Sequence, residues 1–248
     1  MGGVYGLSKL KKNNYLKFGI PYMGSKTKVI PLIARYFPNA DHFYDLFGGG
    51  FSVTHFMLER RSKSYKHFHF NEISHGICDL VKDAIAGKYN YKVFKPEWIT
   101  REKFLKEKDT NAYIRILWSF GNNQRGYLFG KDIEGQKRSM HQAVVFSEFD
   151  KWFKDNFKID KWPDGLDITG KRLYIRKIIR GLKVEGVGRG QLQQLEQLER
   201  LERLQQLEQL EQLEQLEQLQ QLELSNKDYR EINIKSNSII YLDPPYIG

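Results

Sequence analysis

Residues 243–246, Asp-Pro-Pro-Tyr, combine a carboxylate, two prolines and an aromatic ring. Proline has no backbone N–H, so this turn offers only hydrogen-bond acceptors: the Asp243 carboxylate and the carbonyls of Asp243 and Pro244. Such a corner suits an amino group that must give up protons, and the Tyr246 ring after Pro245 can stack on a planar group. The apolar run at 239–242 is expected to be a buried strand that ends at this site. An ordinary surface turn is the alternative interpretation.

A strand, a glycine turn and a helix are expected to face this corner. Residues 42–47 have the composition of a short strand, residues 48–50 are all glycine, and apolar residues recur through the helix expected at 51–58. This order is typical of the cofactor-binding turn of doubly wound α/β folds, because glycine permits the tight turn and the close approach of a ligand. The turn is not Gly-x-Gly-x-x-Gly, which disfavours a nicotinamide cofactor. A glycine turn without a ligand is the alternative.

A second strand is expected at 66–72, and it ends in Glu72 about twenty positions beyond the glycines. An acid at that offset can accept hydrogen bonds from both ribose hydroxyls of a nucleoside cofactor. The helix expected at 74–86 ends before Gly87. His67 and His69 lie two apart on one side of the strand, but no third metal ligand is near them in the sequence, so we interpret them as structural and expect no metal site.

A glycine- and lysine-bearing segment, residues 18–26, precedes a helix expected through 29–36. Gly24 would let the backbone approach a ligand, and Lys26 can meet a carboxylate or a phosphate. An ordinary helix start is the alternative.

The charge of the chain points to a polyanionic partner. The formal net charge is +10, and because residues 191–224 hold eight Glu and two Arg, the other residues carry +16. A basic surface with 14 Tyr and 16 Phe favours nucleic acid as the partner, although charge that only maintains solubility is the alternative. Cys78 is the only cysteine, so no intrachain disulfide can form and a reducing, cytoplasmic setting is expected. No membrane span is expected.

Residues 89–190 are expected to form short helices and irregular segments rich in basic and aromatic residues, including a helix at 111–120. Amides and Arg make bidentate contacts to base edges, and exposed aromatic rings stack or wedge where a base leaves the duplex. The candidate DNA-binding residues are Asn122, Asn123, Gln124, Arg125 and Tyr127. Six basic residues at 171–183 form a candidate phosphate-contacting surface.

Residues 191–224 are a Gln-Leu-Glu repeat with Leu at every third position from 192 to 222. These residues favour an α-helix. Because three residues fall about 60° short of a full helical turn, successive leucines would wind around the helix and would not form the single seam of a heptad repeat. A β-solenoid is disfavoured because an odd period places successive leucines on opposite strand faces. We expect a long helix or helical hairpin that can self-associate, and we hypothesise that it expanded by slippage of the coding DNA.

Taken in order, these segments resemble the Dam-like DNA adenine-N6 methyltransferases over nearly the whole chain except the repeat. The resemblance implies an α/β, doubly wound Rossmann-like sheet, incomplete at its C-terminus, with a helical target-recognition insert. It implies a catalytic domain at 1–88 and 225–248, a recognition region at 89–190 and the repeat at 191–224. It also implies a cytoplasmic bacterial or phage enzyme of the restriction-modification type that binds S-adenosylmethionine and duplex DNA.

The resemblance assigns site residues to both substrates. Cofactor binding falls to Tyr22, Gly24, Lys26, Asp45, Phe47, Gly49, Glu72, Asp228 and Tyr229. Catalysis falls to Asp243, Pro244, Pro245 and Tyr246, with Tyr246 stacking on the flipped adenine.

Two features depart from the family. The repeat has no counterpart there, and family members continue past the tetrapeptide, so we expect a truncated chain or one completed by another fragment. An RNA-base or protein-amide methyltransferase, and an inactive DNA-binding or self-associating fragment, are the alternative functions.

Overall fold

The computed structural model describes residues 17–184, 188–199, 202–217 and 219–244. It is an α/β structure with a four-stranded parallel sheet in the order β3-β2-β1-β4. The strands are β1 His42–Asp45, β2 His67–Asn71, β3 Leu222–Ser225 and β4 Ser238–Tyr241. All three pairings are parallel, so the carboxyl ends of the strands meet at one edge of the sheet.

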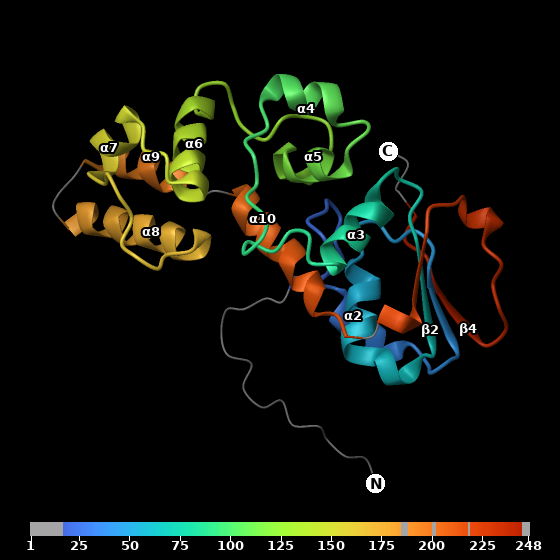
Figure 1. Ribbon diagram of the computed structural model, residues 1–248. Coiled ribbons are helices and arrows are strands. Elements are labelled where there is room, and N and C mark those ends of the chain that lie inside the picture. The colour runs from blue at the N-terminus through green and yellow to red at the C-terminus, as the bar shows by residue number, and fades with distance from the viewer. Residues whose placement is uncertain (1–16, 185–187, 200–201, 218, 245–248) are drawn as a thin grey trace, which may run out of the picture.

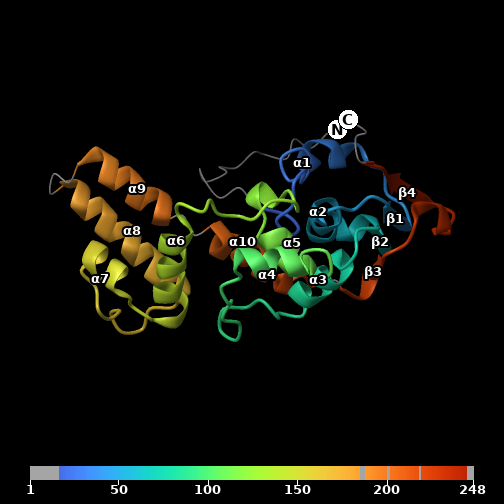
Figure 2. The same ribbon diagram turned by 90° about the horizontal axis from the view of Figure 1, so that it is seen from above.

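One face of the sheet is apolar and covered by helices. Phe43, Phe68 and Phe70 alternate toward this face and are fully buried. Helices α2 and α3 lie against it, and α1 packs on α2 (Figures 1 and 2). The sequence predicted these two strands and the helices that follow them, and the structure confirms them. The helices and short helical turns of this half are α1 Ile30–Ile33, η1 Ala34–Tyr36, α2 Ser52–Arg61, η2 Ser62–Ser64 and α3 Ile77–Ile85.

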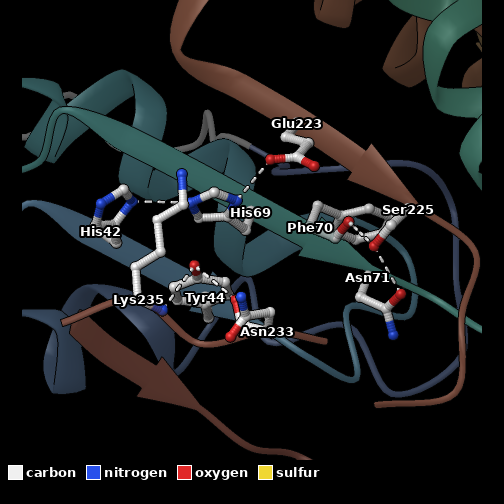
Figure 3. A network of polar contacts seen from close by, with 9 residues as sticks. All are labelled: His42, Tyr44, His69, Phe70, Asn71, Glu223, Ser225, Asn233 and Lys235. Carbon is white, nitrogen blue, oxygen red and sulfur yellow. Dashed lines mark hydrogen bonds and ion pairs between the residues drawn. The ribbon is translucent and has the colours of Figure 1, made fainter. Parts of the chain in front are cut away.

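The opposite face is polar and carries the connection between β3 and β4. His42 Nδ1 lies 3.0 Å from His69 Nε2, and His69 Nδ1 lies 2.9 Å from Glu223 Oε2 (Figure 3). The hydroxyl of Tyr44 donates to the Asn233 carbonyl at 3.4 Å and accepts from the Lys235 N–H at 3.3 Å. The connection therefore lies across this face, and its only described helical turn is η7 Tyr229–Glu231. Among the described residues, helices cover one face only, whereas a doubly wound sheet has them on both.

The strand before the Asp-Pro-Pro turn is an edge strand, not a fully buried one. β4 pairs only with β1 among the described strands, and Ile240 is 44% exposed. This corrects the expectation of a buried strand at 239–242. The run is apolar because Ile239 and Tyr241 pack on the helix-covered face, while the alternate residues do not.

The helical half divides into two groups in both views. Helices α4 and α5 lie beside α10 (Glu202–Glu211), and α6, α7, α8 and α9 (Arg189–Glu199) gather at the end remote from the sheet (Figures 1 and 2). The bounds are α4 Arg101–Glu107, α5 Ala112–Leu117, η3 Phe120–Asn122, α6 Glu134–His141, the π-helix η4 Gln142–Phe146, α7 Lys151–Phe157 and α8 Ile168–Val184. No described helix is long and apolar enough to cross a membrane.

The leucine repeat is not one helix. Its described elements are α9 Arg189–Glu199, α10 Glu202–Glu211, η5 Gln212–Gln215, η6 Leu219–Gln221 and β3 Leu222–Ser225. Leu204, Leu207, Leu210 and Leu213 are fully buried in the common core, so these leucines are not available to a partner chain. Three steps of about 60° still leave them within half of the helix circumference, which is why one face can bury them all. The repeat thus spans the molecule from the helical end into the sheet.

Candidate functional site

A pocket of about 560 Å³ opens at the carboxyl ends of β1, β2 and β4. This edge of a parallel sheet is where α/β folds bind ligands. Its lining includes every described residue that the sequence assigned to cofactor or catalysis: Tyr22, Gly24, Lys26, Asp45, Phe47, Gly49, Glu72, Asp228, Tyr229, Asp243 and Pro244. The glycine turn and the Asp-Pro corner therefore share one cleft. Pro245 and Tyr246 lie outside the described residues.

The glycine turn is as tight as its sequence predicts. The Gly48 N–H donates to the Asn71 carbonyl at 2.9 Å, which ties the turn to the end of β2. A Cβ added at Gly50 would lie 2.3 Å from the Tyr22 Cβ, and Gly49 has φ +50°. A side chain at either position would therefore close or distort the pocket floor.

Glu72 holds the two turns on either side of the pocket. Its Oε2 accepts from the Gly49 N–H at 2.7 Å, and its Oε1 accepts from the Ser74 N–H at 2.8 Å. Each carboxylate oxygen accepts more than one hydrogen bond, so both retain capacity for the hydroxyls of a ligand.

Asp45 is a buried carboxyl group with an incomplete set of partners. Its Oδ2 accepts from the Thr54 hydroxyl at 2.8 Å, while Oδ1 is buried without a hydrogen-bond partner in the described structure. Burial raises the pKa of Asp45 to about 7, and the nearby carboxylates of Asp243 and Glu72 act in the same direction. An ammonium group in the pocket would supply the missing donor and favour the ionised form.

Two aromatic rings line the pocket from opposite parts of the chain. The centroids of Phe47 and Tyr229 are 5.0 Å apart.

Asp228, next to this aromatic pair in the sequence, accepts at Oδ1 from the Arg230 N–H at 2.9 Å, and the hydrogen bonds from Arg230 lower the pKa of Asp228 to about 2. The aromatic pair, the acids and the glycine floor fit a ligand with a planar base, a ribose and an ammonium group.

Lys26 connects the leader to the Asp-Pro corner. Its Nζ forms an ion pair with Asp243 Oδ2 and donates to the Gly24 carbonyl at 3.2 Å. The Lys26 N–H also donates to the Ser52 hydroxyl at 3.1 Å, which fixes the backbone at the start of α2. The sequence predicted that Lys26 meets a carboxylate or phosphate, and in the structure it meets a carboxylate.

Sequence reasoning did not identify Asn71 as part of the site. Its Nδ2 donates to the carbonyls of Leu46 (3.2 Å) and Lys227 (2.9 Å), and its Oδ1 accepts from the Lys227 N–H at 3.1 Å. Asn71 therefore holds the ends of three segments around the pocket. The only sequence signal was an amide at the end of a predicted strand next to Glu72.

The candidate DNA-binding residues lie in a closed loop. Ser119 and Tyr127 form an antiparallel bridge, and the Phe120 N–H donates to the Gly126 carbonyl at 2.9 Å. Asn123 Oδ1 accepts from the backbone of Arg125 (2.9 Å) and Gly126 (3.2 Å), so it shapes the loop tip.

The members of this loop differ in exposure. Arg125 is exposed, whereas Asn122, Asn123 and Gln124 are half-buried. Tyr127 is 7% exposed and its hydroxyl donates to the Ile99 carbonyl at 2.7 Å. This corrects the expectation that Tyr127 offers a free ring, because the ring belongs to the core. Phe120, which the sequence did not single out, is the exposed aromatic side chain of the loop at 68%.

No group of three or more His, Cys, Asp or Glu side chains within the described residues is placed to hold a metal ion. His67 stacks on His42 at 4.8 Å between ring centroids, which is a structural contact of the polar sheet face.

Comparison with known protein families gives one result that covers nearly the whole chain. The model of the D12 class N6 adenine-specific DNA methyltransferases matches residues 22–248. A comparison with curated protein sequences finds no match. The matched range contains the whole pocket described above.

Proposed function

Because the chain belongs to the D12 class of N6 adenine-specific DNA methyltransferases, we propose that it transfers a methyl group from S-adenosylmethionine to the exocyclic amine of a flipped adenine in duplex DNA. The observation that supports this most directly is the shared pocket of the glycine turn and Asp243. A methyl donor held by the first and an amine held by the second would meet there.

The residues of the pocket fit S-adenosylmethionine. Phe47 and Tyr229 would hold the adenine, Glu72 the ribose and Asp45 the ammonium group. When bound, the cofactor supplies an electrophilic methyl group on a sulfonium. The rest of the expected cofactor set also lines this pocket, namely Tyr22, Gly24, Gly49 and Asp228.

The Asp-Pro corner would handle the target amine. An adenine amino nitrogen is a poor nucleophile because its lone pair is delocalised into the ring. Hydrogen bonds from the amine to the Asp243 carboxylate and the Pro244 carbonyl would draw the nitrogen toward tetrahedral geometry. These bonds strengthen as positive charge develops on nitrogen, so they favour the transition state over the ground state.

Lys26 would keep Asp243 in place for this task. The ion pair occupies Asp243 Oδ2, which leaves Oδ1 to accept from the amine. A fixed carboxylate loses no orientational freedom at the moment of reaction.

DNA would bind across the 119–127 loop and the helical end of the molecule. Arg125 is the exposed candidate for base or phosphate contact, and Asn122 and Asn123 lie beside it. Phe120 takes the place assigned to Tyr127 as the ring that can enter the duplex. Of the basic residues of α8, the exposed Lys177 and Arg180 would contact phosphates. Arg172 is buried and paired with Glu208, which corrects its place in that expected surface.

The domain division follows the same proposal. Residues 1–88 and 225–248 would be a Rossmann-like methyltransferase domain, 89–190 the recognition region, and 191–224 the repeat. The repeat differs from a separate insert in two respects: its residues 222–224 lie in β3 of the sheet, and four of its leucines are fully buried in the common core.

Methyl transfer to duplex DNA, RNA and protein from radiolabelled S-adenosylmethionine tests the proposal. We expect transfer to duplex DNA alone, and sequencing of the product would map the methylated adenine. Asp243→Asn should lower the rate while S-adenosylhomocysteine still binds, because the change leaves the aromatic pair and Glu72 intact. Transfer to RNA or protein in preference to DNA, or unchanged turnover in Asp243→Asn, would contradict the assignment.

A further inference from the structure

Arg115 is a buried cation between the 119–127 loop and the cofactor pocket. It lies on α5 and is 8% exposed. Its Nε donates to the Gln124 Oε1 at 3.1 Å, which is a contact with the loop. Its terminal nitrogens donate to the Lys108 carbonyl at 3.3 Å, the Ser74 hydroxyl at 3.4 Å and the His75 carbonyl at 2.5 Å. One guanidinium group therefore bridges the loop and the turn between β2 and α3.

The turn between β2 and α3 is also held by Glu72. The Ser74 N–H donates to Glu72 Oε1, and the other oxygen of the same carboxylate accepts from the Gly49 N–H. A continuous series of contacts thus runs from Gln124 through Arg115 and Ser74 to Glu72 and the glycine turn. A displacement of the guanidinium group would change the position of the acid that faces the ligand's ribose.

The Gln124 side chain also affects the titration of one residue of the pocket. Burial raises the pKa of the Tyr22 hydroxyl, and a hydrogen bond from the Gln124 side chain opposes that shift. Tyr22 lines the pocket. Gln124 is half-buried and its amide oxygen accepts from Arg115, which holds this side chain inside the protein.

The loop backbone is strained where Gln124 is held. Gln124 has φ +65°, in the left-handed region that glutamine rarely adopts, whereas Asn122, at φ +57°, is of a residue type that tolerates this region. Such strain persists only where surrounding contacts impose it, and it is concentrated at functional sites. A ligand that fixes this loop in the observed form would therefore also fix Arg115 and the acid behind it.

We propose that Arg115 and Gln124 couple DNA binding at the 119–127 loop to cofactor binding in the pocket, so that each ligand strengthens the binding of the other. The inference rests on the proposed function, because it takes DNA and S-adenosylmethionine as the two ligands. Arg115 is a positioning residue here, since it acts through Ser74 and Glu72 and lines no part of the pocket itself. Each ligand would order the shared contacts, and the second ligand would then bind without that cost.

Calorimetric titration of S-adenosylhomocysteine, with and without saturating DNA, measures the coupling. The DNA is a duplex with the methylated site or, if no methylation is found, sheared unmethylated genomic DNA. We expect DNA to tighten binding at least about fivefold in the wild type, within the usual range for coupled sites. Gln124→Asn should reduce this ratio to about one. Asn tolerates the left-handed conformation, but it is shorter by one methylene group and does not reach Arg115.

Three further variants separate coupling from stability. Gln124→Glu retains an acceptor for Arg115 and should retain the coupling ratio, even though its negative charge weakens DNA binding. Arg125→Ala, at the exposed loop tip, should weaken DNA binding without changing the ratio. Arg115→Lys should lose the coupling, because a single ammonium group does not span both sides.

The outcomes distinguish this inference from the proposed function. If S-adenosylhomocysteine and DNA both bind but the ratio is one in the wild type, or is the same in Gln124→Asn, the coupling is refuted and the proposed function stands. If S-adenosylhomocysteine does not bind at all, the proposed function fails and the coupling fails with it.

Discussion

Asp45 offers the most direct test of what the pocket binds. Its carboxyl group is buried, its Oδ1 has no partner in the described structure, and its pKa is raised from 3.8 to about 7. A shift of about three pH units corresponds to about 4 kcal/mol, so ionising Asp45 in the ligand-free pocket costs about that much. A ligand whose ammonium group pairs with Oδ1 would remove this cost by stabilising the carboxylate.

Binding of such a ligand must then release a proton below pH 7. At pH 6 about 0.9 of the Asp45 side chains are protonated before binding, if the pKa is about 7. The affinity for S-adenosylhomocysteine should rise about tenfold per pH unit between pH 5 and pH 6.5 and level off above pH 7. This window lies below the usual pKa of an α-amino group, about 7.7–8.0, so the ligand itself keeps its charge.

Calorimetry in two buffers with different ionisation enthalpies counts the released proton. Asp45→Asn should abolish both the release of the proton and the pH dependence of the affinity. At pH 7.5 this change should weaken the binding of S-adenosylhomocysteine by about 30-fold, as expected for the loss of a charge-assisted hydrogen bond of about 2 kcal/mol. Thr54→Val is the matched control: it removes the hydrogen bond that lowers the pKa of Asp45, so proton release should continue to higher pH.

Stability of the ligand-free protein gives an independent check with a definite sign. Between pH 4 and pH 7 the folded state retains a proton on Asp45 that the unfolded state has lost, so this group makes stability fall as pH rises. Asp45→Asn should remove that fall and stabilise the protein at pH 8. If the variant binds S-adenosylhomocysteine as tightly as the wild type, and the wild type releases no proton at pH 6, the ammonium assignment is refuted.

Three further changes test the surrounding structure. Lys26→Met should lower kcat for methyl transfer by about 10- to 100-fold, because Asp243 loses a charge-assisted contact of about 1.5–3 kcal/mol; Lys26→Arg should restore part of it, and an unchanged kcat would rule out the positioning role. Gly50→Ala should weaken S-adenosylhomocysteine binding at least about tenfold, since its Cβ would displace Tyr22; Gly135→Ala, with open space around its Cβ in α6, should bind normally. His55 accepts the Gly19 N–H at 2.8 Å and burial lowers its pKa to about 4, so its contribution to stability is lost as pH falls from 6.5 to 4. His55→Asn should reduce that loss in urea unfolding by up to about 3 kcal/mol, whereas equal acid sensitivity in both proteins would contradict it.

The local elements of the catalytic half were predictable because their signals are short-range. Strand β1, the glycine turn and α2 follow one another within twenty residues, and each has its own pattern of side chains. The common cleft of the glycine turn and Asp243 was expected from the family resemblance and not from the strand pattern alone; the meeting of parallel strand ends at one edge is its structural basis. For Lys26 the sequence indicated only a carboxylate or a phosphate as a possible partner, and it did not single out Asp243.

Long-range partners were not predictable from the sequence. Asn71 holds Lys227, which is 156 positions away, and nothing near Asn71 indicates that pairing. Tyr127 was assigned to the DNA surface because its loop is polar, yet its ring packs against Phe104 and under Arg101. Whether an aromatic ring in a polar loop faces inward depends on what lies beneath the loop, which is a tertiary property.

The register of the repeat, meaning which of its three-residue units occupies which position in the fold, depends on residues that break its period. A shift of the chain by one three-residue unit would leave each leucine from 195 to 219 on a leucine site, so these leucines do not define the register. Arg203 excludes a shift in one of the two directions. Its buried guanidinium group lies 4.3 Å from the Trp118 ring and donates to the Glu97 carbonyl. A shift that brought Gln206 to this position would replace the guanidinium group with a neutral amide.

Arg200 would satisfy that site after a shift in the opposite direction, so a second marker is required. Leu222 and Leu224 supply it, since they are the only leucines of the repeat that lie two apart. A spacing of two places both side chains on one face of a strand, while the Glu223 side chain between them faces His69 on the other. The low-complexity segment therefore has one register because a buried cation fixes its helix and an altered leucine spacing fixes its strand.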